Sequence, residues 1–387
     1  MLCEFYNEKL EFQENLLVKY YCKHNYEVVV VTSTYNSVFD YYNNRNSNKD
    51  PERVYYDNCA KIIKLKYKLN ILYKLRVFKS IKKILSDEQP DLIYLHDIML
   101  NIPECVDYMR SRKNVRMIMD YHADYSNSGK NWLSISILHG IIRKWYLDKA
   151  RPYLSKIFPI VPDGMKFLNE VYKVPNCEME VLPLGADLDL INEIKLSNSK
   201  LELRKKLGYK KCDKIVFTGG KLLPRKRTEI LIDAILSAEI PMKLIIIGDS
   251  DENDLAYKQS LIDKVGINQN IKFTGWLGTV DIYKYMIISD LAVFPACQSI
   301  IWQQAIAVGL PLIGGNKGHQ HLDYLRISDC IINPELSDLT PERLMRMITS
   351  LFQDESKLTN MRNNTKIVTK ELLDWNEQIK KTVRYNI

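Results

Sequence analysis

The chain has 387 residues, of which 46% are hydrophobic and 26% are charged, and its formal net charge is +8 at pH 7. This length suits two domains of ordinary size, each with its own core. The density of charge, and the lack of an apolar run long enough to cross a bilayer, exclude an integral membrane protein. The excess of cations favours an acidic partner such as a phosphate or an anionic membrane.

The eight cysteines are scattered singly, and no two of them form a Cys-x-x-Cys pair. The first residues, MLCEFYNEKLEF, do not place a basic region before an apolar stretch, so we expect no signal peptide. For a chain of this length, these observations predict reduced thiols and a cytoplasmic location.

In the first half of the chain, short apolar runs alternate with stretches of helical periodicity. The predicted strands are 27–32, 92–96, 115–121, 157–161 and 178–182, and the predicted helices are 11–23, 71–87, 132–148 and 164–172. Residues 36–51, which are rich in Asn and Tyr, are predicted to be a mobile loop. Another strand should precede the first helix, and only residues 1–5 are available for it.

The second half continues the alternation. Its predicted strands are 214–218, 243–248, 271–274, 291–294, 311–313 and 330–332, and its predicted helices are 226–237, 253–264, 279–288, 302–309, 340–352 and 355–369. Continuous apolar strands are typical of parallel sheets buried on both faces. The alternation therefore predicts two doubly wound domains with right-handed crossovers, and the Pro and Gly of 183–190 suggest their junction.

Residues 61–85 contain nine Lys or Arg and no acidic residue. On the helix expected at 71–87, Ile71, Leu75, Phe78 and Leu85 would share one face. Such a basic amphipathic segment can lie on anionic lipid, or it can be a solvated helix whose apolar stripe faces the core. Both interpretations stay open.

The strongest chemical signal is a glycine turn that carries cations. The strand 214–218 runs into Gly219 and Gly220 and then into KLLPRKR at 221–227, and a helix follows. Paired glycines let the backbone approach a ligand closely, and a helix N-terminus favours an anion. The pattern is not a Walker loop, because G-x-x-x-x-G-K-[ST] is absent.

This turn resembles the G-R-L-x-x-x-K-G segment of the family-4 glycosyltransferases, and further motifs follow in that family's order. They are LPLGAD at 182–187, LIIIGD at 244–249, FTGW at 273–276, SDLAVFP at 289–295 and QAIAVGLPLI at 304–313. The resemblance covers most of the chain and implies the GT-B fold, two Rossmann-like doubly wound domains facing a cleft. Residues 1–185 would bind the acceptor, 186–370 would bind the nucleotide sugar, and 371–387 would form a helix crossing back to the first domain, with Trp375 as its core anchor.

The resemblance also implies site residues in the second half. Lys221 and Lys226 would neutralise the donor diphosphate and stabilise the departing nucleotide. The donor would also meet Gly219, Gly220, Trp276, Leu277, Gln298, Ser299, Ile300 and Gln304. The family pattern has two glutamates eight residues apart, and this chain has Ala296 and Gln304 there. The amide of Gln304 can still bond a ribose hydroxyl, whereas Ala296 cannot replace a carboxylate, and Gln298 is a candidate substitute.

In the first half, the resemblance gives His122, at the end of the strand 115–121, a place beside the reacting sugar. His96 and Asp97 end the strand 92–96 at a similar edge. A lone histidine is more often structural, but two at strand ends raise the odds of a function. Polar residues that could meet an acceptor follow in a loop: Ser126, Asn127, Ser128 and Lys130.

Two segments could instead bind a metal. Residues 249–251 read Asp-Ser-Asp, and His319, Gln320 and His321 precede Asp323. An acidic surface loop explains the first better, and a donor contact or a plain loop explains the second better. Because GT-B enzymes generally need no metal, the resemblance implies neither a metal nor another cofactor.

The sequence thus predicts a retaining glycosyltransferase that moves a sugar from a nucleotide sugar to a glycan or lipid-linked acceptor. Surface polysaccharide or lipopolysaccharide assembly is the expected setting, at an anionic membrane if 61–85 touches one. One alternative is a non-catalytic nucleotide-sugar binder or partner subunit, and another is a sugar-nucleotide epimerase. Nucleic acid is not an expected partner, because no binding motif accompanies the charge.

Overall fold

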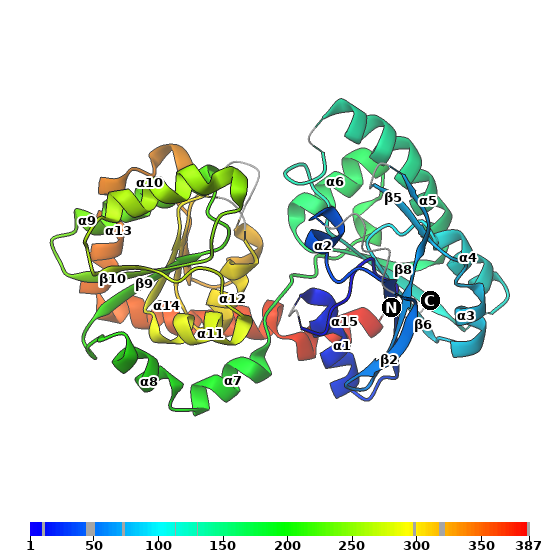
Figure 1. Ribbon diagram of the computed structural model, residues 1–387, viewed down its shortest axis with the longest axis horizontal. Helices are drawn as coiled ribbons and strands as arrows, with labels where there is room; N and C mark the ends of the chain where they lie inside the picture. Colours follow the sequence, from blue (N-terminus) through cyan, green and yellow to red (C-terminus); the bar gives the residue numbers. More distant parts are fainter. Residues whose placement is uncertain are drawn as a thin grey trace. The chain divides into compact units, whose positions relative to one another are not determined.

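The computed structural model describes residues 1–9, 12–43, 51–71, 74–112, 114–129, 131–296, 299–316 and 322–384. The chain forms two compact units (Figure 1). Unit 1 is Met1–Pro183 together with the C-terminal segment from Trp375, and unit 2 is Leu184–Asp374. Within the described ranges, no helix has the length and apolar character that a membrane crossing requires.

Unit 2 is built on one six-stranded parallel sheet. Its strands are β9 (Lys214–Gly219), β10 (Met242–Ile247), β11 (Ile271–Phe273), β12 (Leu291–Phe294), β13 (Leu312–Gly314) and β14 (Ile331–Ile332). They lie in the order β11-β10-β9-β12-β13-β14. This is the Rossmann order, in which the chain direction across the sheet reverses between β9 and β12. Ligands of such sheets bind at that reversal, beyond the carboxyl ends of the strands.

Helices cover both faces of this sheet. They are α7 (Leu188–Leu196), α8 (Ser199–Lys206), α9 (Thr228–Leu236), α10 (Leu255–Val265), α11 (Thr279–Ile288), α12 (Ile300–Val308), α13 (Pro341–Gln353) and α14 (Glu355–Val368). One core lies under α9, α10 and α13, and the other lies under α7, α11 and α12. Figure 1 shows α10 and α11 on opposite sides of the strands. The predicted strands of this half are all confirmed to within one or two residues.

Unit 1 has a second sheet whose parallel strands follow the same order, with β2 paired antiparallel to β3 at one edge. Its members are β1 (Val28–Ser33), β2 (Arg53–Asp57), β3 (Ala60–Leu65), β6 (Leu92–His96), β7 (Arg116–Tyr121) and β8 (Leu154–Pro159). The expected first strand is reduced to Leu2, which bridges Val31 of β1 and Leu95 of β6 in parallel. Leu2 thereby joins β2-β3-β1 to β6-β7-β8. The predicted strand at 178–182 is wrong, since only Met179 forms an isolated bridge there.

The helices of unit 1 are α1 (Gln13–Lys23), α2 (Val38–Asn43), α3 (Lys82–Glu88), α4 (Ile102–Arg110), the π-helix η2 (Ser134–Arg143), α5 (Lys144–Ala150), α6 (Pro162–Tyr172) and α15 (Trp375–Val383). The final helix packs against α1, where the Tyr21 and Thr382 hydroxyls lie 2.6 Å apart. Trp375 is fully buried in the same cluster. The loop expected at 36–51 contains α2, and its residues 44–50 lie outside the described ranges.

The basic segment 61–85 is not an amphipathic helix, so that prediction is wrong. The chain there forms β3, the antiparallel pair β4 (Tyr67–Ile71) and β5 (Leu75–Phe78), and the start of α3. Four of its nine cations are paired with acids distant in sequence: Lys61 with Glu88, Arg76 with Glu4, Lys79 with Glu52 and Lys82 with Asp107. Lys64 is buried and donates to the Tyr6 carbonyl at 2.9 Å. Four of the nine cations that look concentrated in the sequence are therefore compensated by acids in the fold.

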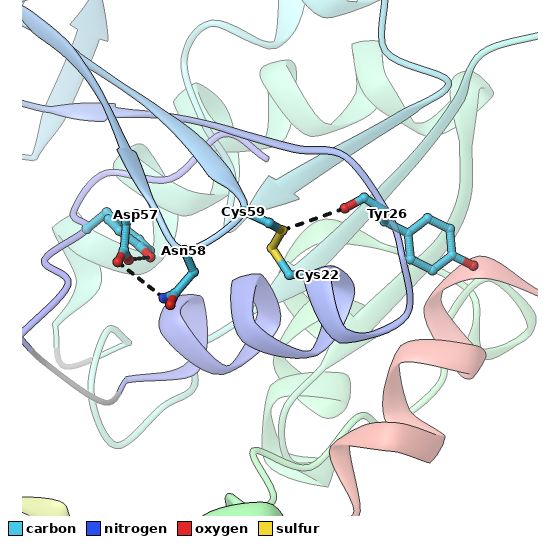
Figure 2. Close-up of a disulfide and its surroundings, with 6 residues drawn as sticks. Cys22, Tyr26, Asp57, Asn58 and Cys59 are labelled. Carbon is cyan, nitrogen blue, oxygen red and sulfur yellow. Dashed lines mark hydrogen bonds between the residues drawn. A yellow bond between two sulfur atoms is a disulfide. The ribbon is translucent and has the colours of Figure 1, made fainter.

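Cys22 and Cys59 form a disulfide between the end of α1 and the β2–β3 turn (Figure 2). The prediction that all cysteines are reduced thiols is therefore wrong for this pair. Among the described cysteines, Cys3, Cys105, Cys177, Cys212 and Cys330 are free. Because disulfides persist in oxidising surroundings, the cysteines no longer support a reducing compartment.

Candidate anion site and histidine cluster

The glycine turn lies at the strand-order reversal of unit 2. Gly219 ends β9, and Gly220 takes a left-handed conformation with φ of 107° and donates to the Ile247 carbonyl at 3.0 Å. Gly248, with φ of 98°, ends the neighbouring strand so close to the Gly220 carbonyl that any side chain there would collide with it. Such close approach of two backbones requires glycine at position 248.

The side chain of Lys226 folds back over this turn. Its ammonium group lies where a Cβ on Gly220 would sit, and it donates to the Gly219 carbonyl at 3.4 Å. Lys226 ends a short 3-10 turn, Pro224–Lys226, after which Arg227 adopts a left-handed φ of 55° and α9 begins. The turn therefore directs one cation to the carboxyl end of β9.

Lys226 forms part of the wall of a small hollow. The lining residues are Thr218, Gly219, Gly220, Leu222, Lys226, Thr228, Ile246, Phe294, Pro295 and Ala296. The first turn of α12 lies beside it, since Ile301 approaches the Gly220 position to 3.6 Å. Ser299 caps α12 by accepting from the Ile301 amide. A glycine turn, a lysine and the positive end of a nine-residue helix thus converge, which is the arrangement that binds a phosphate.

Lys221 is placed differently from Lys226. Its ammonium pairs with the carboxylate of Asp251, which directly precedes the 3-10 turn before α10. Lys221 is not among the residues lining the hollow. Both side chains are well exposed, so the ion pair contributes little stability. Lys221 can therefore change partner at low cost.

The other predicted donor residues are only partly brought to the hollow. Trp276 lies in the loop after β11 and is 63% exposed, while Leu277 packs against the core. Gln304 is half-buried on α12, and Ile300 is exposed at the start of that helix. Gln298 lies outside the described residues. Ala296 does line the hollow, so no carboxylate is supplied from that position.

In unit 1, the ends of β6 and β7 bring together two histidines around a buried carboxylate. Asp120 stands opposite His96 in the β6–β7 register. Its Oδ2 lies 2.8 Å from His96 Nδ1 and 3.4 Å from His122 Nε2, and Oδ1 accepts from the Asp97 amide at 3.0 Å. The Tyr94 hydroxyl also donates to Oδ2, at 2.9 Å.

The charges of this cluster stabilise one another. Burial would lower the pKa of His96, but the carboxylate of Asp120 outweighs it and raises the pKa to about 9, with Glu14 contributing at 4.0 Å from Nε2. Burial likewise would raise the pKa of Asp120, but His96 and His122 hold it well below its usual range. At neutral pH, therefore, His96 is a buried cation paired with Asp120. The side chain of His122 is 27% exposed, so it is the more accessible of the two histidines.

The polar groups of the loop after β7 form hydrogen bonds within the loop itself. Asp124 Oδ1 accepts from the amides of Ser126 and Asn127 and from the Ser126 hydroxyl, at 2.6 to 3.1 Å. Asn127 Nδ2 also donates to the His122 carbonyl at 2.9 Å. The turn therefore fixes the backbone of His122 rather than presenting loose donors. Lys130 lies outside the described residues.

Two clusters have the residue types of a metal site. His96, Asp120 and His122 offer ligand atoms within 4.8 Å of one another, but the carboxylate is already paired with a protonated histidine. Asp249 and Asp251 each pair with a lysine, Lys258 and Lys221 respectively. The carboxylates of both clusters are thus compensated by cations of the chain. His319, Gln320 and His321 lie outside the described residues.

Sequence reasoning missed several residues of these sites. Asp120 precedes His122 by two positions, and the two-residue period of a strand puts both side chains on one face, which was a readable signal. Gly248 and Gly275 were seen only as parts of motifs, yet their backbones pair at 2.8 Å beside the glycine turn. Thr218, Thr228 and Pro295 carried no distinguishing pattern.

Comparison with known families gives two matches that together span most of the chain. The model described as "Glycosyl transferases group 1" matches residues 199–368, and the model described as "Glycosyltransferase Family 4" matches residues 16–190. A curated relative, the GDP-mannose-dependent monoacylated alpha-(1-6)-phosphatidylinositol monomannoside mannosyltransferase of Corynebacterium glutamicum, is 28% identical over 152 residues. That match covers 36% of this chain and 39% of the relative's length.

Several solved structures match the fold over nearly the whole chain, although their sequence identity to it is low. Anabaena HepE in complex with UDP is 16% identical, with a TM-score of 0.68 over 99% of this chain and 98% of its own. Sucrose-phosphate synthase from Thermosynechococcus elongatus is 15% identical, with a TM-score of 0.67 over 98% and 96%. WaaG, a glycosyltransferase involved in lipopolysaccharide biosynthesis, is 14% identical, with a TM-score of 0.60 over 99% and 98%. These likenesses confirm the expected GT-B fold.

Proposed function

Because this chain belongs to the family-4 glycosyltransferases, we propose that it transfers a sugar from a nucleotide-sugar donor to a hydroxyl group of a glycan or lipid-linked acceptor. Unit 2 binds the donor and unit 1 binds the acceptor. The anomeric configuration of the sugar is retained, and neither a metal nor another cofactor takes part.

One observation carries the donor assignment: a lysine ammonium, a glycine turn and a helix N-terminus meet at the strand-order reversal of unit 2. A nucleotide sugar has a diphosphate that needs such compensation, and the need grows as the sugar departs and charge develops on the phosphate. Lys226 makes this contact. Lys221, now paired with Asp251, exchanges that carboxylate for the phosphate when the donor binds.

The reaction follows from the charges available. The bond between the anomeric carbon and the phosphate oxygen breaks, and a bond to the acceptor oxygen forms on the same face of the sugar. The hydroxyl proton passes to the departing phosphate oxygen. No carboxylate occupies the Ala296 position to act as a nucleophile, which favours this front-face route. His122, steadied by Asp120, bonds hydroxyl groups of the donor sugar and the acceptor.

A lipid-linked acceptor suits the relatives described above. The Corynebacterium enzyme is named for a mannosylated phosphatidylinositol, and WaaG is described as involved in lipopolysaccharide biosynthesis. We therefore place the reaction in the assembly of a surface polysaccharide, a lipopolysaccharide or a related glycolipid, at a membrane.

The absence of the paired carboxylates favours one second candidate, a protein of this fold that binds a nucleotide sugar without turnover. The test has two stages. A thermal-shift screen of nucleoside diphosphates and nucleotide sugars identifies the donor, because a ligand of the native state raises the melting temperature. Mass spectrometry then follows incubation of that donor with lipid and glycan acceptors. Transfer supports the proposal, and donor binding with neither transfer nor hydrolysis supports the second candidate.

A further inference from the structure

Unit 1 carries an exposed apolar ridge whose side chains belong neither to the lining of the hollow nor to the histidine cluster. It begins just before η2 and runs along η2 and α5. Its side chains are Trp132, Leu133, Ile137, Ile141 and Trp145, with exposed fractions of 71%, 60%, 41%, 64% and 50%. Contiguous apolar surface of this kind is uncommon on a soluble protein and marks a place of interaction.

The exposed side chains of the ridge belong to a helix whose opposite side is packed in the core. Leu133, Ile137, Ile141 and Trp145 recur every fourth residue, which aligns them along one side of a helix. The opposite side is fixed in the core, where Leu147 and Ala150 are fully buried. His139 is buried as well, and its Nδ1 lies 2.6 Å from the Tyr172 hydroxyl. The exposed side chains therefore cannot turn inward without breaking this packing.

The charged residues around the ridge are predominantly basic. From Tyr125 to Leu147 the sequence contains no Asp or Glu. Lys149 lies with its ammonium 3.7 Å from the centre of the Trp145 ring, so its apolar stem follows the ridge to a charged end. The nearest acid in sequence, Asp148, is bonded to Lys144 at 2.8 Å. No uncompensated carboxylate of 125–149 would repel an anionic surface.

The β4–β5 hairpin of unit 1 also exposes apolar side chains. Leu69 and Ile71 of β4 are 46% and 43% exposed. Burial lowers the pKa of His139 to about 4, and the charges of Arg143 and Lys74 contribute to the decrease.

We propose that this ridge docks unit 1 on the surface of an anionic phospholipid bilayer. The ridge is a line of exposed side chains along one side of a helix, so it fits a deformable lipid surface. Tryptophan and branched aliphatic residues beside lysine are what the interface between headgroups and acyl chains accepts. The membrane contact expected at 61–85 thus moves to 132–149.

Sedimentation of the full-length protein with vesicles tests the proposal. Wild-type protein should bind vesicles that contain phosphatidylglycerol, and it should bind neutral phosphatidylcholine vesicles more weakly. The double variant Trp132→Gln/Ile141→Gln should lose at least about tenfold in partitioning, because two large apolar groups no longer enter the interface. Lys149→Glu should weaken binding to the anionic vesicles more than to the neutral ones.

Leu196→Gln/Leu201→Gln is the matched control, because these leucines are 89% and 72% exposed in unit 2. This variant should bind vesicles as the wild type does. Melting temperatures of all variants should agree, since every substituted side chain is exposed. Failure of the wild type to bind anionic vesicles, or unchanged binding by the ridge variant, would overturn the proposal. So would a wild-type dimer that the ridge variant abolishes, because a second copy of the chain would then cover the ridge.

The result is separable from the proposed function. The ridge lies in unit 1 and the donor hollow in unit 2, so the ridge variant should keep its affinity for a soluble nucleoside diphosphate. Loss of vesicle binding with intact nucleotide binding supports the docking surface alone. Loss of both would point to misfolding and would count against the ridge as an independent surface.

Discussion

Gly220 is the residue at which the donor site tolerates least change. A Cβ there would occupy the space of the Lys226 ammonium, and φ of 107° is costly for any other residue. The sequence pattern predicted a glycine turn beside cations, but it did not predict which lysine folds over the turn. That choice depends on Asp251, which holds Lys221 from a loop thirty residues further along the chain.

We expect Gly220→Ala to weaken nucleoside diphosphate binding at least about tenfold, roughly 1.4 kcal/mol, because the methyl group displaces Lys226. Titration calorimetry measures the effect. Gly208→Ala is the control, since Gly208 has φ of 68° with open space around its Cβ position. It shares the backbone strain and should leave the affinity unchanged. Equal losses in both variants would contradict a local role for Gly220.

The pairing of His96 with Asp120 predicts that the protein loses stability at alkaline pH. The pKa of His96 is raised to about 9, so its contribution is complete below the unfolded-state value near 6.5 and is lost as pH rises through about 9. The difference in unfolding free energy between wild type and Asp120→Asn should therefore shrink by on the order of 3 kcal/mol across that window. Chemical denaturation at several pH values measures it, and a difference that stays constant from pH 6.5 to 10 would refute the pairing.

At the scale of elements, the sequence predicted what continuous apolar runs and helical periodicity can specify. The buried strands β6 and β12 were predicted with their observed bounds, and α11 likewise. The region 51–78 was not, although an Asn58-Cys59 turn with φ of 53° at Asn58 joins two paired strands there. Asn at a two-residue turn between β-branched and aromatic runs is a hairpin signal. The many lysines of this region obscured the hairpin signal, because the acids that pair with them lie far away in sequence.

The disulfide is the element-scale feature that sequence reasoning could not find. Cys22 and Cys59 are separated by 37 residues and have no spacing motif, and only the packing of α1 against the hairpin brings them together. A loop of this length constrains the unfolded chain enough to contribute about 4 kcal/mol.

Reduction of the denatured protein should raise the number of titratable thiols by two. Cys22→Ser/Cys59→Ser should also lower the melting temperature of unit 1, because the unfolded chain regains its freedom. Cys177→Ser/Cys212→Ser, at two exposed free cysteines, should not change it. An unchanged thiol count after reduction would argue against the disulfide.

For the whole molecule, two sheets of the same strand order define where the chemistry lies. In unit 2 the reversal between β9 and β12 holds the phosphate-binding arrangement, and in unit 1 the ends of β6 and β7 hold the histidine cluster. The family motifs predicted both regions. They did not predict that Asp120 would join His96 to His122, because that depends on the register of two strands.

Donor binding should leave a signature confined to unit 2. Amide hydrogen exchange should slow at Gly219, Gly220, Leu222, Lys226 and Thr228, which line the hollow, and at the start of α12 beside it. The amides of η2 and α5 serve as an internal reference and should exchange at the same rate with and without ligand. Protection confined to unit 1 would contradict the assignment.

The most direct measurement is the affinity of Lys226→Ala for the nucleoside diphosphate that best stabilises the wild type, compared with its affinity for the parent nucleoside. If Lys226 holds the diphosphate, the variant should bind the diphosphate at least about tenfold more weakly and should bind the nucleoside as the wild type does. Unchanged diphosphate affinity would show that the phosphates bind elsewhere, and the donor site would then have to be abandoned.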